Sequence, residues 1–192
     1  MSIDAGEFRR TLGHFATGVT VVTTQYQNEL HGTTVSSFSS LSLDPPLVLV
    51  CLDLKTSIHD LIVASQIFGV NILAEHGETT SRHFARHAPD KFSTVPYDLG
   101  QLAVPLLRDA LATLECRVVA HYAGGDHSIF IGEVVAINTA HASQARPLLF
   151  FRSKYSQLHS SPHPLANGAT GTPTRVNHAP EVPALFNATA LD

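Results

Sequence analysis

The amino-acid sequence predicts a mainly β domain, a barrel or sandwich with a few short helices at its sides. Six or seven segments are rich in β-branched or apolar residues and are bounded by turn residues, which is typical of strands. Two of the longest are joined by Ala123-Gly124-Gly125-Asp126, a sequence that favours an antiparallel hairpin. The strands do not alternate with long helices, which disfavours a doubly wound nucleotide-binding fold.

The first predicted element is a helix near the N-terminus. Its apolar residues Phe8, Leu12 and Phe15 recur at helical spacing, and the sequence that starts at Asp4 fits a capping box. We expect this helix to end before Gly18, because glycine is a poor helix former.

Strands and two more short helices account for the rest of the predicted fold. Strands are expected at Val19–Thr24, within the hydroxyl-rich stretch Gly32–Leu43, and at Leu47–Leu52, Phe68–Leu73, Leu114–His121, Ile129–Ile137 and Leu148–Phe151. The strand Leu47–Leu52 is uninterrupted in its apolar character, which predicts burial on both faces. Helices are expected at Ser57–Ala64, with Ser57 as the N-cap, and at Glu78–His87.

Composition and charge exclude several classes of protein. The chain has 192 residues, 44% hydrophobic and 15% charged, and its net charge is 12 − 16 = −4. A nucleic-acid binder or a polybasic membrane-surface protein is therefore not expected. No apolar stretch is long enough to span a membrane, and the acidic start is not a signal peptide. The two cysteines, Cys51 and Cys116, form no disulfide framework, so we expect a reduced, cytoplasmic protein.

The composition changes near residue 158. Residues 159–192 contain 5 of the 11 prolines and only three charged side chains, and they show no apolar period. The sequence therefore predicts one folded domain over residues 1–158, followed by a Pro-, His- and Ala-rich tail that is disordered or loosely attached.

The usual catalytic motifs are missing from the sequence. It contains no dinucleotide-binding glycine motif, P-loop, nucleophile elbow or Cys-x-x-Cys, so an enzyme of this sequence would take its reactive group from a cofactor. Among the 12 histidines, His83 and His87 are four residues apart on one expected helix. No third ligand stands beside them, so we expect surface histidines and no metal.

Three polar segments are candidates for ligand binding. The segment Gly32–Ser42 places seven hydroxyl side chains next to a strand expected to be buried, and hydroxyl groups suit a planar heterocycle or a phosphate as well as a polar edge strand. Lys55-Thr56-Ser57 opens a helix and fits either a phosphate site or an ordinary N-cap. Asp126-His127 follows the hairpin turn, where the histidine is either structural, exposed or part of a site.

Taken in order, these pieces resemble the flavin reductases that serve two-component flavin monooxygenases. The similarity extends over residues 7–158. Its signatures are Phe15-Ala16-Thr17-Gly18-Val19-Thr20-Val21-Val22-Thr23-Thr24, His31-Gly32-Thr33-Thr34-Val35-Ser36-Ser37-Phe38, Ser42-Leu43-Asp44-Pro45-Pro46-Leu47-Val48-Leu49-Val50, Val70-Asn71-Ile72-Leu73, Ser81 with Phe84-Ala85, Gly125-Asp126-His127, Ile131-Gly132-Glu133-Val134, and Pro147-Leu148-Leu149-Phe150-Phe151 with Lys154-Tyr155.

The resemblance implies a fold and an activity. The fold is an antiparallel Greek-key split β-barrel, usually a homodimer with the flavin near the subunit interface. The activity is reduction of FMN, FAD or riboflavin by NADH or NADPH, with reduced flavin released to a separate flavin-dependent monooxygenase. Because hydride transfer between two cofactors needs no protein nucleophile, the absence of a catalytic motif agrees with this reading.

The resemblance also implies which residues form the site. Thr33, Thr34, Val35, Ser36 and Ser37 would line the flavin ring, and Cys51, Leu52, Lys55, Thr56 and Ser57 would lie near the ribityl phosphate. His83 and Phe84 would close over the flavin. His127, the candidate catalytic residue, would face the nicotinamide, with Arg152, Lys154 and Tyr155 nearby. Many relatives carry alanine followed by asparagine or serine where this chain has Thr34-Val35-Ser36.

Three alternatives stay open at this point. A non-catalytic flavin carrier or sensor of the same fold would hold its flavin without oxidising a nicotinamide. A small β module that binds a metal through its histidines would show no affinity for flavin. A hydrolase lacks a recognisable nucleophile motif, although a Ser/His arrangement assembled only in the folded protein would escape sequence inspection.

Overall fold

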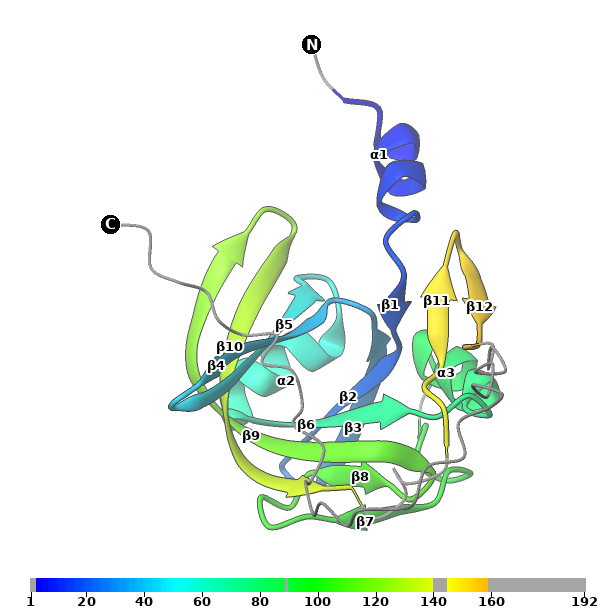
Figure 1. The fold of residues 1–192 in the computed structure, drawn as a ribbon. Helices are drawn as coiled ribbons and strands as arrows, with labels where there is room; N and C mark the ends of the chain where they lie inside the picture. Colours follow the sequence, from blue (N-terminus) through cyan, green and yellow to red (C-terminus); the bar gives the residue numbers. More distant parts are fainter. Residues whose placement is uncertain (1–2, 89, 140–144, 159–192) are drawn as a thin grey trace, which may run out of the picture. The chain divides into compact units, whose positions relative to one another are not determined.

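The computed structural model describes residues 3–88, 90–139 and 145–158, which Figure 1 shows as a ribbon. The helices in this part of the chain are α1 (Ala5–Leu12), α2 (Ser57–Ser65) and α3 (Glu78–Ala85). The strands are β1 (Thr17–Gly18), β2 (Thr20–Tyr26), β3 (Glu29–Val35), β4 (Phe38–Leu43), β5 (Pro46–Asp53), β6 (Ile67–Leu73), β7 (Tyr97–Leu99), β8 (Pro105–Leu107), β9 (Ala110–Gly124), β10 (His127–Asn138), β11 (Leu149–Phe151) and β12 (Lys154–Ser156). The prediction of a mainly β fold with antiparallel sheets and few helices is confirmed.

Seven of the strands form one antiparallel sheet in the order β3-β2-β6-β9-β10-β5-β4. Tight turns set the register of its hairpins. Between β2 and β3, Gln27 and Asn28 have positive φ values of 50° and 65°, which suit a two-residue hairpin turn. The predicted hairpin between β9 and β10 is confirmed, because His127 pairs with Gly124 and Gly125 adopts a φ of 74° in the turn.

The two edge strands of this sheet are consecutive in the chain. β3 and β4 lie at opposite ends of the strand order, yet only Ser36 and Ser37 separate them. The sheet therefore curves so that its edges approach each other. Its concave face is filled by one buried cluster in which Val22 of β2 meets Val50 of β5 and Phe130 of β10.

Helix α2 packs against this curved sheet. Ile58 and Ile62 belong to the same buried cluster as the strand side chains, and α2 contacts β2 and β3. Burial of these two isoleucines removes apolar surface from water, at about 1.5–3 kcal/mol for each fully buried side chain. This packing fixes the start of α2, which matters for the site described below.

A second buried cluster lies under α3. It joins Val21 and Leu73 of the main sheet to Phe84 of α3 and to Phe92 and Leu107. A three-stranded sheet (β1-β11-β12) and a two-stranded sheet (β7-β8) complete the described structure. The strands β7 and β8 were not predicted, because three residues are too few to show a period.

Several predicted boundaries are wrong. Helix α1 ends at Leu12 with Gly13 as the C-cap, so Phe15 lies outside it and Gly18 does not end it. Helix α3 ends at Ala85, because Arg86 is extended, so His87 is not helical. The start of α1 is confirmed, since the Asp4 side chain accepts a hydrogen bond from the Glu7 backbone N–H.

The start of α2 and the burial of β5 also differ from prediction. Thr56, not Ser57, is the N-cap of α2. Strand β5 alternates between buried and partly exposed residues instead of being buried on both faces. The reason is that only one face of β5 meets the core, where Val48, Val50 and Leu52 join the buried cluster.

No helix among the described residues is long and apolar enough to cross a membrane. The expected tail, residues 159–192, lies outside the described part of the chain, so its disorder stays a prediction.

Candidate functional site

Several of the predicted site residues lie at one end of the main sheet. The loop Ser36-Ser37, the end of β5 and the start of β10 meet there because β5 pairs with both neighbours. Asp53 pairs with His127 of β10, and the Leu54 N–H donates to the Asp126 carbonyl at 3.1 Å. The helix α2 begins three residues after Leu54, so its first turn joins the same end of the sheet.

The loop between β3 and β4 is tied to β5 by two hydrogen bonds. The Ser37 hydroxyl donates to the Cys51 carbonyl at 2.7 Å, and the Cys51 N–H donates to the Ser37 carbonyl at 3.1 Å. The Leu52 side chain is buried in the core, whereas Cys51 is partly exposed, and burial raises the pKa of its thiol. The loop is therefore held in place, and in the part of the chain that the structure describes the outer edges of β3 and β4 are not paired with another strand.

The turn that leads into α2 is built on Asp53. Its side chain accepts from the Lys55 N–H at 2.8 Å, and its carbonyl accepts from the Thr56 hydroxyl at 2.7 Å. Because the Thr56 hydroxyl is used in this way, no side chain caps α2. The His59 N–H donates to the Thr56 carbonyl at 3.1 Å, which leaves the N–H groups of Ser57 and Ile58, uncapped by any side chain, to face an anion.

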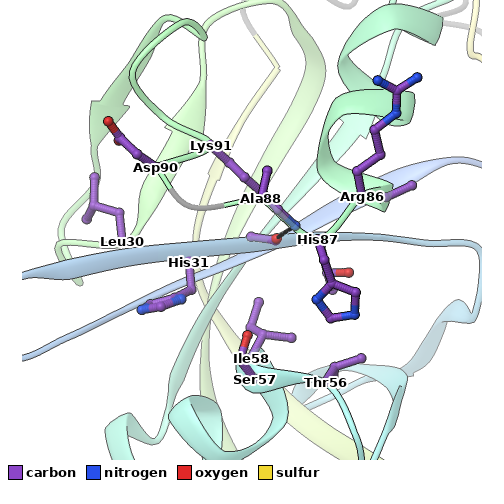
Figure 2. A pocket seen from close by; sticks show the side chains of 13 residues that line it. Leu30, His31, Thr56, Ser57, Ile58, Arg86, His87, Ala88, Asp90 and Lys91 are labelled. Atoms are coloured by element: carbon purple, nitrogen blue, oxygen red, sulfur yellow. Dashed lines mark hydrogen bonds between the residues drawn. The ribbon is translucent and has the colours of Figure 1, made fainter.

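A cavity of about 240 Å³ opens beside this turn. It is lined by residues 30–33 of β3, by residues 56–58 at the start of α2, and by residues between Ala85 and Lys91 after α3. Figure 2 shows the His87 ring pointing towards Thr56 and Ser57, whereas the Arg86 side chain points away from them. The cavity thus brings an imidazole and hydroxyl groups to the start of a helix.

Two groups in the cavity wall were not predicted from the sequence. The His31 Nε2 atom is buried and has no hydrogen-bond partner among the described residues, although Glu29 Oε2 lies 3.5 Å away. The Lys91 Nζ donates to the carbonyls of Gly32 and Phe84 at 3.0 and 2.9 Å. Burial lowers the pKa of Lys91, and its two bonds join β3 to α3.

Helix α3 supports β3 from behind. Thr34 Oγ1 donates to the Ser81 carbonyl at 2.7 Å, and His83 Nε2 lies 2.8 Å from the Lys91 carbonyl. Phe84 is 0% exposed and lies directly beneath Gly32. The Phe84 ring is thus part of the core in this structure, and its predicted role of closing over a flavin stays a prediction. No group of three His, Cys, Asp or Glu side chains suited to a metal occurs in the described ranges.

Arg152, Lys154 and Tyr155, which were predicted to lie near His127, belong to the β11–β12 hairpin or its turn. Tyr155 Oη is 2.8 Å from Ser81 Oγ, and the Arg152 guanidinium lies over the Phe151 ring. Figure 1 shows β11 and β12 on the opposite side of the chain from the β9–β10 hairpin where His127 lies. A single chain therefore does not bring Arg152, Lys154 or Tyr155 next to His127.

His127 is partly exposed at the start of β10. Its Nδ1 lies 2.7 Å from Asp126 Oδ1, and the side chain is 41% exposed. The hydrogen bond from His127 is the main cause that lowers the pKa of the Asp126 carboxyl. The carboxylate orients the imidazole, whose other nitrogen faces away from this contact.

The residues at this end of the sheet fit a flavin. Hydroxyl and backbone groups of residues 33–37 suit the carbonyls and nitrogens of the flavin ring, and the uncapped start of α2 beside Lys55 suits its phosphate. The buried His31 Nε2 makes no hydrogen bond within the described ranges, although Glu29 lies nearby, so it has hydrogen-bonding capacity for a ligand.

Comparison with known proteins supports this assignment. The flavin reductase like domain matches residues 12–159. The NADH-dependent flavin reductase StyB of Pseudomonas fluorescens is 39% identical over 86% of this chain and 95% of its own length. An NADH-dependent FAD reductase of Streptomyces globisporus is 44% identical over 69% of this chain and 75% of its own length.

A solved structure shows the same relationship. The Streptomyces globisporus NADH:FAD oxidoreductase, in complex with NAD and FAD fragments, matches with a TM-score of 0.79 and 39% identity, over 83% of this chain and 95% of that one. The family match, the sequence identity and the shared structure agree over the same part of the chain, which therefore belongs to the flavin reductase like family.

Proposed function

We propose that this protein is an NADH-dependent flavin reductase that transfers a hydride from NADH to FAD or FMN. One observation carries the proposal: Ser36-Ser37, the uncapped start of α2 and His127 meet at one end of the sheet. NADH is favoured over NADPH because the relatives are named for NADH.

The chain's own residues bind and orient the two substrates. Residues 33–37 hold the edge of the flavin ring, and Lys55, Thr56 and Ser57 hold its phosphate. When bound, the flavin supplies the acceptor for the hydride. In this proposal His127 contacts the nicotinamide, and the hydrogen bond to Asp126, which holds its ring, supports that role. The protein's work is to align the two rings and exclude water, so no nucleophile is needed.

The finer fold and assembly belong to the same proposal. We propose that the curved sheet is a Greek-key barrel split between β3 and β4, whose unpaired edges are separated by two residues. Leu41 and Leu43 of the edge strand β4 are 45% and 75% exposed, which supports a homodimer that covers them. Arg152, Lys154 and Tyr155 would reach the nicotinamide only from such a second copy.

The cellular role follows from the chemistry. Reduced flavin would be released to a separate flavin-dependent monooxygenase, as the name of the related reductase subunit HsaB of Mycobacterium tuberculosis indicates for that protein. Both cysteines are free thiols, which supports a reducing compartment such as the cytoplasm.

The test is NADH oxidation by the purified full chain with FAD, FMN or riboflavin added in turn. Oxidation that requires added flavin is expected, and NADPH should be slower. A folded protein that oxidises neither nicotinamide with any flavin would refute the proposal. If it also holds a flavin that does not exchange, the protein is a carrier of the same fold.

A pair of variants locates the site in the same assay. His127→Gln should raise the KM for NADH or lower kcat, because the oriented imidazole is lost. The matched control is His76→Gln, which changes an exposed histidine in the turn between β6 and α3. Equal kinetics for both variants would remove His127 from the site.

A further inference from the structure

A buried histidine and serine join α2 to β10. His59 Nε2 lies 2.9 Å from Ser128 Oγ, and His59 Nδ1 lies 2.8 Å from Asp60 Oδ1. His59 is 9% and Ser128 is 5% exposed. An ionised Asp60 only accepts hydrogen bonds, so Nδ1 carries a hydrogen, and in the neutral imidazole Nε2 then accepts from the Ser128 hydroxyl.

Asp60, His59 and Ser128 are hydrogen-bonded in the sequence acid, histidine, serine, as in the catalytic triad of a hydrolase. Unlike a catalytic serine, however, Ser128 is not exposed to substrate. Ser128 is buried in the core, and it does not line the cavity beside the start of α2. The His59 ring is packed edge-on against Phe130. Because the hydroxyl is buried and already bonded to His59, we assign it no role in nucleophilic attack.

His59 and Ser128 each follow closely, along the chain, one part of the proposed site. His59 is the third residue of α2, which begins just after Lys55 and Thr56 at the proposed phosphate end. Ser128 is the second residue of β10 and follows His127 at the proposed nicotinamide side. The start of β10 is also held by its pairing with β5, in which His127 lies opposite Asp53, and by the main-chain bond from the Leu54 N–H to the Asp126 carbonyl. The bond between His59 and Ser128 adds a side-chain link from α2 itself.

We propose that His59 and Ser128 are positioning residues that fix His127 relative to the flavin phosphate end of the site. The inference rests on the proposed function. Without the Ser128 hydroxyl, the buried His59 Nε2 loses its partner, and the side-chain hydrogen bond between α2 and the start of β10 is lost. The flavin contacts at residues 33–37 and 55–57 do not depend on that hydroxyl.

The predicted consequence is specific to the hydride-transfer step. In Ser128→Ala, the single-turnover rate of flavin reduction by NADH should fall about tenfold or more, because a misplacement of about 1 Å costs up to about a hundredfold. The Kd for flavin in the absence of NADH should not change. Ser128→Thr, which keeps the hydroxyl, should recover most of the rate.

The matched control is Ser65→Ala at the other end of α2. Ser65 Oγ lies 2.9 Å from Thr24 Oγ1, so this variant also removes a hydroxyl contact between α2 and the sheet, far from the site. A purely structural role predicts that Ser128→Ala and Ser65→Ala both lower the Tm and leave the single-turnover rate of the folded enzyme unchanged. That result would overturn the proposal.

A second variant covers the case in which Ser128→Ala does not fold. His59→Gln keeps an amide that can hydrogen-bond to Ser128 but loses the geometry of the ring, so its rate should fall while its Kd for flavin stays the same. An unchanged rate in His59→Gln would overturn the proposal. Absence of NADH oxidation by the wild-type protein would instead refute the proposed function, so the two failures are distinguishable.

Discussion

The replacement of Gly32 by alanine tests the packing that shapes the cavity wall. A Cβ at this position would lie 2.7 Å from Phe84 Cε1 and 2.8 Å from Phe84 Cδ1, with Phe92 Cζ at 3.2 Å. Both contacts with Phe84 are shorter than real carbon contacts. The Phe84 ring has no room to retreat, because it is fully buried and packs against Phe92 with centroids 5.1 Å apart.

Two opposing terms set the size of the effect. Overpacking a core typically costs about 1–3 kcal/mol, and the fixed Phe84 ring places this site near the upper value. Replacing a strand glycine by alanine stabilises the folded protein by about 0.5–1 kcal/mol, because alanine loses less backbone entropy on folding. The net loss in free energy of unfolding for Gly32→Ala is therefore about 2 kcal/mol. For a chain of this size, that corresponds to a fall in Tm of about 4–8 °C.

Thermal and urea denaturation of Gly32→Ala, Phe84→Leu and the double variant measure this effect. The smaller leucine leaves space for the new methyl group, so the double variant should be more stable than the sum of the single effects predicts by about 1 kcal/mol or more. Additive effects, or a Tm for Gly32→Ala equal to that of the wild type, would refute the packing argument.

Three further outcomes follow from single interactions. Tyr155→Phe removes the partner of the buried Ser81 hydroxyl and should lower the free energy of unfolding by about 1–2 kcal/mol; an unchanged urea midpoint would contradict this. Burial raises the pKa of the Cys116 thiol to about 12, so a disulfide reagent should label it at neutral pH only after unfolding, and rapid labelling of the native protein would disprove that. The hydrogen bond from His127 lowers the pKa of the Asp126 carboxyl. The resulting stabilisation exists while the carboxyl is ionised and is lost as the pH falls through that lowered pKa. An NMR titration should show the pKa return towards its ordinary value in His127→Gln, and no return would exclude the imidazole as its cause.

The mainly β fold was predictable because strands and hairpin turns are specified by residues close together in the sequence. Strands such as β6 and the β9–β10 hairpin are specified by β-branched runs and by Gly124-Gly125, which act within a few residues. The ends of the helices were less predictable. The first helix was expected to reach Phe15, yet it ends at Leu12, because Gly13 caps it and its backbone carbonyl accepts from the distant Arg152 N–H.

The candidate site was predictable only in part, for a related reason. Thr33, Thr56 and Ser57 line the cavity as polar segments of the sequence suggested. Lys91 could not be found in this way, because its partner carbonyl on Gly32 is 59 residues away and its neighbours form no motif. The burial of Phe84 likewise depends on a cluster assembled from distant strands.

The arrangement of the site explains why its sequence signal is weak. The groups proposed to hold the flavin are backbone N–H groups, hydroxyls and the first turn of α2. Their ability to bind depends more on the position of the backbone than on the identity of the side chains. Such a site is sensitive to small displacements of its supports. The buried link between His59 and Ser128 is therefore the kind of contact that a reductase without a protein nucleophile would need, because ring alignment is the part of the reaction that its own residues control.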